Sequence, residues 1–190
     1  MIGGEYQTAP KKMYEFPDGV IAYEGVINRQ IKSIVLKKLS GNGFKVVDLC
    51  PTELDVPLDI RVKTANIYAE KYRPNNCLVI SLHSNAGGGT GFEIWTSRGE
   101  TASDIYAEMF GENFQASFPE IRFRKNMADG DLDKEAAFYI LQKTDCPAIL
   151  PEFMFFDNWE DFKILRDPNK QAEYADMIVS FIKRAEITVV

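Results

Sequence analysis

The chain has 190 residues, which fits one domain or one domain with a small appendage. Its net charge of −6 and its lack of a basic stripe argue against nucleic acid or an anionic membrane surface as the main partner. No apolar run is long enough to span a bilayer, and the first residues show no signal peptide, so the localisation stays open. Three widely spaced cysteines indicate reduced, buried thiols and not a disulfide framework.

Strand-like and helix-like segments alternate along the chain. The first half is expected to contain a loop over 3–19, a helix over 24–39 that Gly41 ends, a strand over 44–49, a loop over 51–57, a helix over 58–72 and a strand over 77–82. The second half is expected to contain a strand over 92–96, a helix over 102–118, an irregular stretch over 119–131, a short helix over 134–142, a strand over 146–150 and helices over 158–165 and 170–184.

This order predicts a single α/β domain over residues 1–190, with a mostly parallel, twisted sheet and helices on both of its faces. The chain opens with a loop that leads into a helix, whereas an α/β domain usually opens with a strand. No internal repeat or linker divides the sequence.

The single histidine, His83, follows the predicted strand over 77–82 and precedes a run of three glycines. Ligands of open α/β sheets bind at the carboxyl ends of strands, and imidazole is a common zinc ligand. A lone histidine is nevertheless more often structural than functional, so its neighbours decide the interpretation.

Two carboxylates are placed to share one rim of the sheet with His83. Glu24 begins the first long helix, where the helix dipole alone would favour a carboxylate. Glu152 follows the predicted strand over 146–150 inside an apolar run, where partial desolvation would raise its pKa toward the range of a general base. One imidazole and two carboxylates suggest a hydrolytic metal site.

Three strings carry a resemblance to a known family. They are Tyr23-Glu24-Gly25-Val26-Ile27-Asn28-Arg29, Ser81-Leu82-His83-Ser84-Asn85-Ala86, and Pro147 to Phe153 with Asn158 beyond. In this order and spacing the chain resembles the zinc-dependent N-acetylmuramoyl-L-alanine amidases of the amidase-3 type, found in bacterial autolysins and phage endolysins. The resemblance covers nearly the whole chain.

The resemblance implies a peptidoglycan hydrolase that degrades the cell wall by cleaving the amide between N-acetylmuramic acid and L-alanine. It implies that Glu24 and His83 bind zinc and that Glu152 is the catalytic base, acting on a zinc-activated water. Substrate-binding residues stay unknown: Arg29, Arg61 and Lys134 could contact substrate carboxylates, but each is more simply a surface charge. Secretion and release at phage lysis both fit such an enzyme.

The chain departs from the family at the first zinc ligand, a histidine that follows the first strand in family members. We therefore expect that the first strand and its histidine are missing together, that the zinc site is incomplete and that activity is weak or lost. An unpaired sheet edge would then invite a dimer or a strand swap. The alternatives are a catalytically impaired peptidoglycan-binding relative and a metal-free α/β domain whose rim residues are coincidental.

Overall fold

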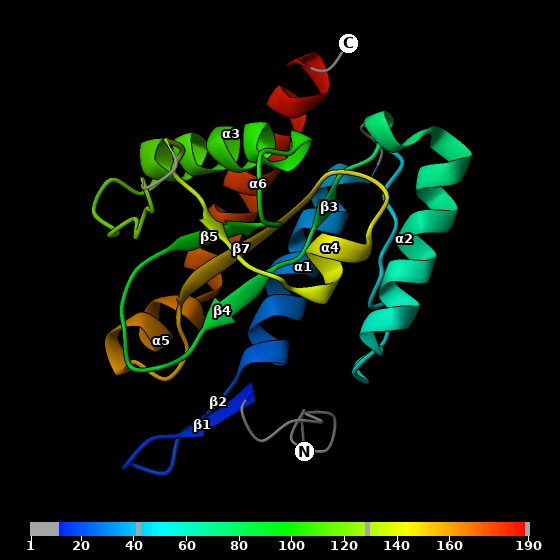
Figure 1. Cartoon of the computed structure of the whole chain (residues 1–190). Coiled ribbons are helices and arrows are strands. Elements are labelled where there is room, and N and C mark those ends of the chain that lie inside the picture. The colour runs from blue at the N-terminus through cyan, green and yellow to red at the C-terminus, as the bar shows by residue number, and fades with distance from the viewer. Residues whose placement is uncertain (1–11, 41–42, 128–129, 189–190) are drawn as a thin grey trace.

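A central sheet of five strands runs through the residues that this computed structural model describes, which are 12–40, 43–127 and 130–188 (Figure 1). Its strands are β3 (Val79–Ile80), β4 (His83–Asn85), β5 (Glu93–Thr96), β6 (Lys134–Glu135) and β7 (Ala148–Phe155). The long β7 is the central strand: β3 and β4 pair with successive halves of one edge, and β5 pairs with the other edge and carries β6.

The predicted α/β class is confirmed, and the sheet contains one antiparallel pairing. β3, β4 and β7 are mutually parallel where they pair, as are β5 and β6, whereas β5 runs antiparallel to β7. The reason lies in the glycine-rich connection from β4 to β5, residues 86–92, which is too short for a helical crossover. Two consecutive strands joined in this way must run in opposite directions.

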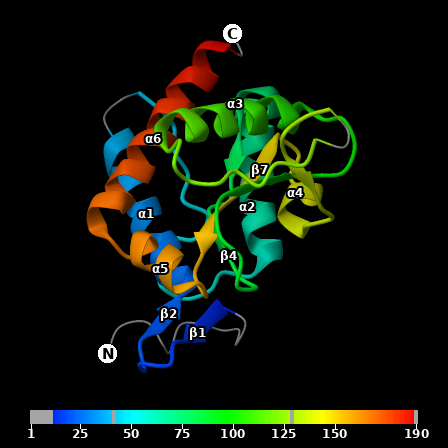
Figure 2. The ribbon, with the colours of Figure 1, turned by 90° about the vertical axis from the view of Figure 1, so that its left-hand side faces the viewer.

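Helices cover both faces of this sheet. They are α1 (Glu24–Leu39), α2 (Leu58–Tyr72), the 3-10 turn η3 (Pro74–Asn76), α3 (Ala102–Ser117), α4 (Tyr139–Lys143), α5 (Trp159–Leu165) and α6 (Pro168–Thr188). Figure 2 shows α1, α5 and α6 on one side of β7, and α2 and α4 on the other. A two-stranded hairpin, β1 (Met13–Glu15) with β2 (Ile21–Tyr23), precedes α1. None of the helices that the structure describes combines the length and the hydrophobicity needed to cross a bilayer.

The alternation of side chains along β7 decides which way the site faces. Ile149 and Phe153 point into the larger core with α1, α3, α5 and α6, whereas Ala148 and Leu150 point into the smaller core with α2 and α4. Because side chains alternate along a strand, Glu152 shares the face of Ala148 and Leu150. The regular pairing ends just beyond it, where buried Met154 adopts a positive φ of 58° and the register with β4 shifts.

Several predicted boundaries were wrong. The strand predicted over 77–82 is shortened to β3, and a further strand, β4, begins at His83, so His83 does not lie in a loop. The strand predicted over 146–150 continues to Phe155, so Glu152 lies inside β7 and not beyond it. Residues 134–142 form β6 and α4 where one helix was expected. The expected loop over 3–11 and the helix-ending Gly41 lie outside the described residues.

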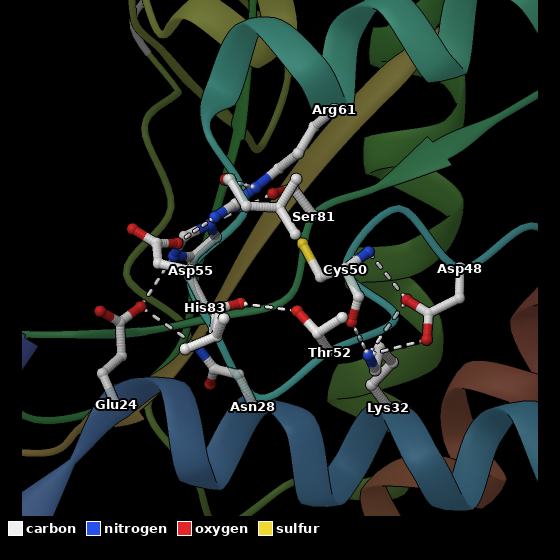
Figure 3. A network of polar contacts seen from close by, with 12 residues as sticks. Glu24, Asn28, Lys32, Asp48, Cys50, Thr52, Asp55, Arg61, Ser81 and His83 are labelled. Carbon is white, nitrogen blue, oxygen red and sulfur yellow. Dashed lines mark hydrogen bonds and ion pairs between the residues drawn. The ribbon is translucent and has the colours of Figure 1, made fainter. Parts of the chain in front are cut away.

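The segment 44–49, predicted to be a strand, is not one: it pairs with no strand among the described residues. A cavity of about 780 Å³ is lined by this segment on one side and by residues 77–83 on the other. Ion pairs anchor this segment and the loop after it: Lys32 Nζ lies 2.9 Å from Asp48 in the segment, and Arg61 Nη2 lies 2.5 Å from Asp55 in the loop (Figure 3). The apolar side chains of 44–49 are typical of a strand, but a strand also needs a neighbour to which its backbone can hydrogen-bond. Here the cavity separates the segment from β3.

Candidate active site

Three ionisable side chains lie in a row across neighbouring strands of the sheet. In the β4–β7 register His83 is opposite Glu152, and in the β5–β7 register Glu93 is opposite Glu152. Directly opposed residues project from the same face of a sheet, with Cα atoms about 5 Å apart. The row His83–Glu152–Glu93 therefore forms one continuous polar strip at the end of the smaller apolar core.

Glu24 joins this strip from the first turn of α1. His83 donates from Nδ1 to Glu24 Oε1 over 2.7 Å, and the Glu24 side chain is buried. Burial alone would raise the pKa of Glu24, but the hydrogen bond and positive charge of His83 hold it below its usual value. Burial alone would lower the pKa of His83, but Glu24 and then Glu152 raise it above its usual value. Each partner of this hydrogen bond therefore favours the charged form of the other.

A chain of side-chain hydrogen bonds fixes this pair in place (Figure 3). Asn28, one turn along α1, donates from Nδ2 to Glu24 Oε1 over 3.1 Å and accepts from the buried Ser84 Oγ over 3.0 Å. On the other side of the ring, His83 Nε2 lies 3.1 Å from Ser81 Oγ. Supporting partners of this kind orient functional side chains, because they restrict the rotamers that each can adopt.

Glu152 has the environment of a proton-transfer group. Its Oε2 atom is shielded from solvent and has no hydrogen-bond partner among the described residues. Burial raises the pKa of Glu152 to about 7, with the charge of His83 opposing this shift and the charges of Glu24 and Glu93 adding to it. A carboxyl that titrates near neutrality can both accept and return a proton.

Glu93 is the functional candidate that the sequence reasoning missed. It is 3% exposed, and its Oε1 accepts from Arg124 Nε over 2.5 Å and from Lys134 Nζ over 2.7 Å, while Oε2 accepts from Asn85 Nδ2 over 2.9 Å. Burial would raise its pKa, but the hydrogen bonds and charges of both cations hold it below its usual value. The signal in the sequence was a carboxylate inside the apolar strand Phe92-Glu93-Ile94-Trp95.

Two aspartates hold the glycine-rich loop that leads away from the site. Asp157 Oδ2 accepts from the backbone N–H groups of Gly87 and Gly88, over 2.6 and 3.0 Å. The buried Asp161 accepts from Thr90 Oγ1 over 2.6 Å and from Gly91 N over 3.1 Å. Because both aspartates follow β7, they tie the loop to the strand that carries Glu152.

The structure brings the predicted residues Glu24, His83 and Glu152 to one place. Of the three basic residues considered, Lys134 is at the site through Glu93. Arg61 instead holds the loop over 51–57: its Nε donates to Val56 O over 2.7 Å and its Nη2 pairs with Asp55.

The donors suit a zinc ion in kind but not in number. An imidazole and a carboxylate are both zinc ligands, and zinc hydrolases use three protein ligands. Among the described residues, no group of three His, Cys, Asp or Glu side chains is placed to hold a metal ion. His83 Nδ1 and Glu24 Oε1 form a hydrogen bond with each other. The described site therefore falls one ligand short.

Comparison with known proteins agrees with this architecture. The chain is similar to an uncharacterised protein of Clostridium perfringens, at 26% identity over 150 residues, and to the N-acetylmuramoyl-L-alanine amidase CwlM of Bacillus licheniformis, at 33% over 112 residues. These matches cover 76% and 58% of this chain, but it spans only about two fifths of each relative, 41% and 39%.

A solved structure shares the fold over almost its whole length. The N-acetylmuramoyl-L-alanine amidase of Clostridium difficile 630 superposes with a TM-score of 0.76 at 23% identity, covering 93% of this chain and 90% of that one. The family model described as Amidase_3, N-acetylmuramoyl-L-alanine amidase, matches residues 15–184. With so much of its length matched, the chain belongs to the amidase-3 family of N-acetylmuramoyl-L-alanine amidases.

Proposed function

We propose that this chain acts on peptidoglycan and hydrolyses the amide between the lactyl group of N-acetylmuramic acid and L-alanine. Family membership supports the substrate class. The observation that carries the proposal is the pairing of Glu152 with His83 across β4 and β7, which sets a carboxyl of raised pKa beside an imidazole. The whole protein's activity is part of the proposal, because the chain spans only part of its longer relatives.

Glu152 is the general base in this proposal. It accepts a proton from the water that attacks the lactyl carbonyl carbon, and a C–O bond forms. The C–N bond then breaks, and the proton passes from Glu152 to the departing amino nitrogen of L-alanine. A pKa of about 7 suits both halves of this transfer, because neither protonation state is strongly disfavoured at neutral pH.

Glu24 and His83 are the residues we propose as zinc ligands, held in orientation by Asn28 and Ser81. The described residues supply these two ligands and no third, which favours a second candidate function: a peptidoglycan-binding relative with impaired catalysis. The two candidate functions share the site around Glu152 and differ in whether the bound amide is hydrolysed.

We also propose that a second copy of the chain pairs at the edge of β3 that no described strand occupies. Val79 N donates to Pro147 O, just before β7, and Ser81 N donates to Ile149 O in β7, over 2.9 Å each. The N–H and C=O groups of Ile80, between them, therefore point away from β7. Segment 44–49 lines the far side of the same cavity without strand pairing among the described residues. Unpaired edges of this kind favour strand exchange.

Purified cell walls distinguish the two candidate functions. The chain is incubated with walls, with and without added zinc, and two quantities are followed: the newly exposed amino groups of alanine and the fraction of protein that sediments with the walls. Release of alanine amino groups supports the amidase. Sedimentation without release supports the binding relative. The absence of both release and sedimentation would overturn the assignment to peptidoglycan.

A further inference from the structure

Two cations contact buried Glu93, the residue that lies opposite the proposed base Glu152 in the β5–β7 register. The Glu93 side chain is 4% exposed, whereas those of Arg124 and Lys134 are 31% and 23% exposed. The three groups carry a net charge of +1, since one carboxylate faces two cations. A buried carboxylate needs one cation for neutrality, and Asn85 already serves its other oxygen. The second cation is therefore in excess of what the fold requires.

Arg124 is held in position with donors to spare. Its backbone N donates to Phe92 O over 2.9 Å, and its guanidinium lies 5.2 Å from the centre of the Phe155 ring. Only its Nε bonds to Glu93, and its two terminal nitrogens have no partner among the described residues. Lys134 Nζ likewise lies 5.2 Å from the centre of the Trp95 ring and keeps further N–H groups beyond its bond to Glu93.

The position of these cations relative to Glu152 follows from the sheet register. Glu93 is directly opposite Glu152, and Trp95 is the register partner of Lys134 on β6. Strands in a sheet are about 4.8 Å apart, and extended peptide advances about 3.4 Å per residue. A substrate group held by the cations would therefore lie one to two residues from the bond at which Glu152 acts.

We infer that Arg124 and Lys134 form a subsite for a carboxylate of the stem peptide, on the leaving-group side of the scissile amide. This rests on the proposed function. The ligand group is the α-carboxylate of the γ-linked D-glutamate that follows L-alanine in the stem. An arginine with free terminal nitrogens, backed by a buried anion that fixes its orientation, is suited to hold a planar carboxylate.

Two synthetic muramoyl tripeptides test the subsite. Both contain L-alanine, a γ-linked D-glutamyl residue and L-lysine, and they differ only in whether that glutamyl residue carries an α-carboxylate or an α-carboxamide. Binding is measured by calorimetry in a Glu152→Gln background, so that turnover does not consume the ligand. We expect the carboxylate form to bind about tenfold more tightly, and Arg124→Gln and Lys134→Gln each to remove most of this preference.

Lys125→Gln is the matched control, because it removes an exposed positive charge from the residue next to Arg124. It should keep the preference. Arg124→Lys, which keeps the cation beside Glu93, should retain part of it and guards against a folding defect in Arg124→Gln. Equal binding of both ligands to the parent, or a preference that survives both glutamine variants, overturns the subsite but leaves the proposed function standing. Failure to bind either ligand overturns both.

Discussion

His83 and Glu152 are register partners on the parallel strands β4 and β7, so an imidazole and a carboxyl from residues 69 positions apart in the chain face the same side of the sheet. The pairing places each within the other's field: Glu152 helps to raise the pKa of His83, and His83 opposes the rise in the pKa of Glu152. Burial of Glu152 is the larger effect, and it keeps this carboxyl titrating near pH 7.

Replacing the proposed base should abolish turnover without unfolding the protein. Glu152→Gln keeps the volume of the side chain but cannot accept a proton, so we expect the rate of alanine amino-group release to fall by at least about 100-fold. The temperature of thermal unfolding should not fall at neutral pH or above, because the amide replaces a desolvated carboxyl that destabilises the fold when it is charged. Glu108→Gln, at an exposed position on α3, is the control. A Glu152→Gln protein as active as its parent would exclude Glu152 as the base.

Zinc binding by this chain should be weak and should depend on Glu24 and His83. Because the described residues supply two ligands where zinc hydrolases use three, we expect the metal to be lost on dialysis, as measured by elemental analysis. In calorimetric titrations, Glu24→Gln and His83→Gln should each weaken zinc binding by more than about tenfold. The three free thiols are a competing source of affinity, so a variant with Cys50, Cys77 and Cys146 changed to Ser is the control. Tight zinc binding in both site variants would place the metal elsewhere.

The sequence indicated the site better than it indicated the sheet. Apolar periodicity predicted α2 to the residue, because Val62, Ala65 and Ala69 recur on one buried face. The three strings around Glu24, His83 and Glu152 predicted a cluster that the structure forms. The strand boundaries were less accurate, because an apolar run does not reveal where hydrogen-bonding partners end. Segment 44–49 has no strand partner in the described part of the chain, and β7 continues through Glu152 to Phe155.

The local sequence pattern could not predict ion pairs between residues that are far apart in the chain. Glu93 is separated by 31 and 41 residues from Arg124 and Lys134, and only the folded sheet brings their side chains together. Arg124 lies in a stretch that the sequence marked as irregular, where a backbone bond to Phe92 nevertheless fixes it. Local spacing carries no information about such contacts.

Buried Asp133 should make stability fall as pH rises. It is 1% exposed, and burial, together with the charges of Asp131 and Asp104, raises its pKa from 3.8 to about 7 despite a hydrogen bond from Thr96. The folded state then binds more protons than the unfolded state between these values. The destabilisation is absent below pH 3.8, where both states are protonated, and complete above about pH 7.

Asp133→Asn tests this effect, because the amide resembles the protonated acid. We expect the variant to exceed its parent in free energy of unfolding by more than about 1 kcal/mol at pH 8 and to match it near pH 4, as measured by urea denaturation. Asp145→Asn, at an exposed position, should show no such pH-dependent gain. A gain of equal size at both pH values would point to packing and not to proton binding.

The open edge of β3 should produce concentration-dependent association. We expect light scattering after size-exclusion chromatography to show a dimer that grows with protein concentration. Val46 is 44% exposed on the segment that lines the cavity, so Val46→Lys should suppress the dimer by adding a charge at the edge. Ile67→Lys, at a 63% exposed position on α2, is the matched control. A monomer at every concentration would refute the pairing.

Asp161 should be the most sensitive of the residues that hold the loop beside the site. It is 2% exposed, and its Oδ2 accepts from Gly91 N over 3.1 Å and from Phe155 N over 2.9 Å, while its Oδ1 accepts from Thr90 Oγ1. Asp161→Ala leaves buried donors unsatisfied, so we expect a loss of about 3 kcal/mol in the free energy of unfolding. Glu160→Ala, at the exposed neighbouring position, should change stability by less than about 0.5 kcal/mol.

Because the loop leads directly into the strand of Glu93, Asp161→Ala should also weaken binding of the muramoyl tripeptide at temperatures where the protein remains folded. Unchanged stability would mean that solvent satisfies these donors, and that the loop is held by Asp157 alone.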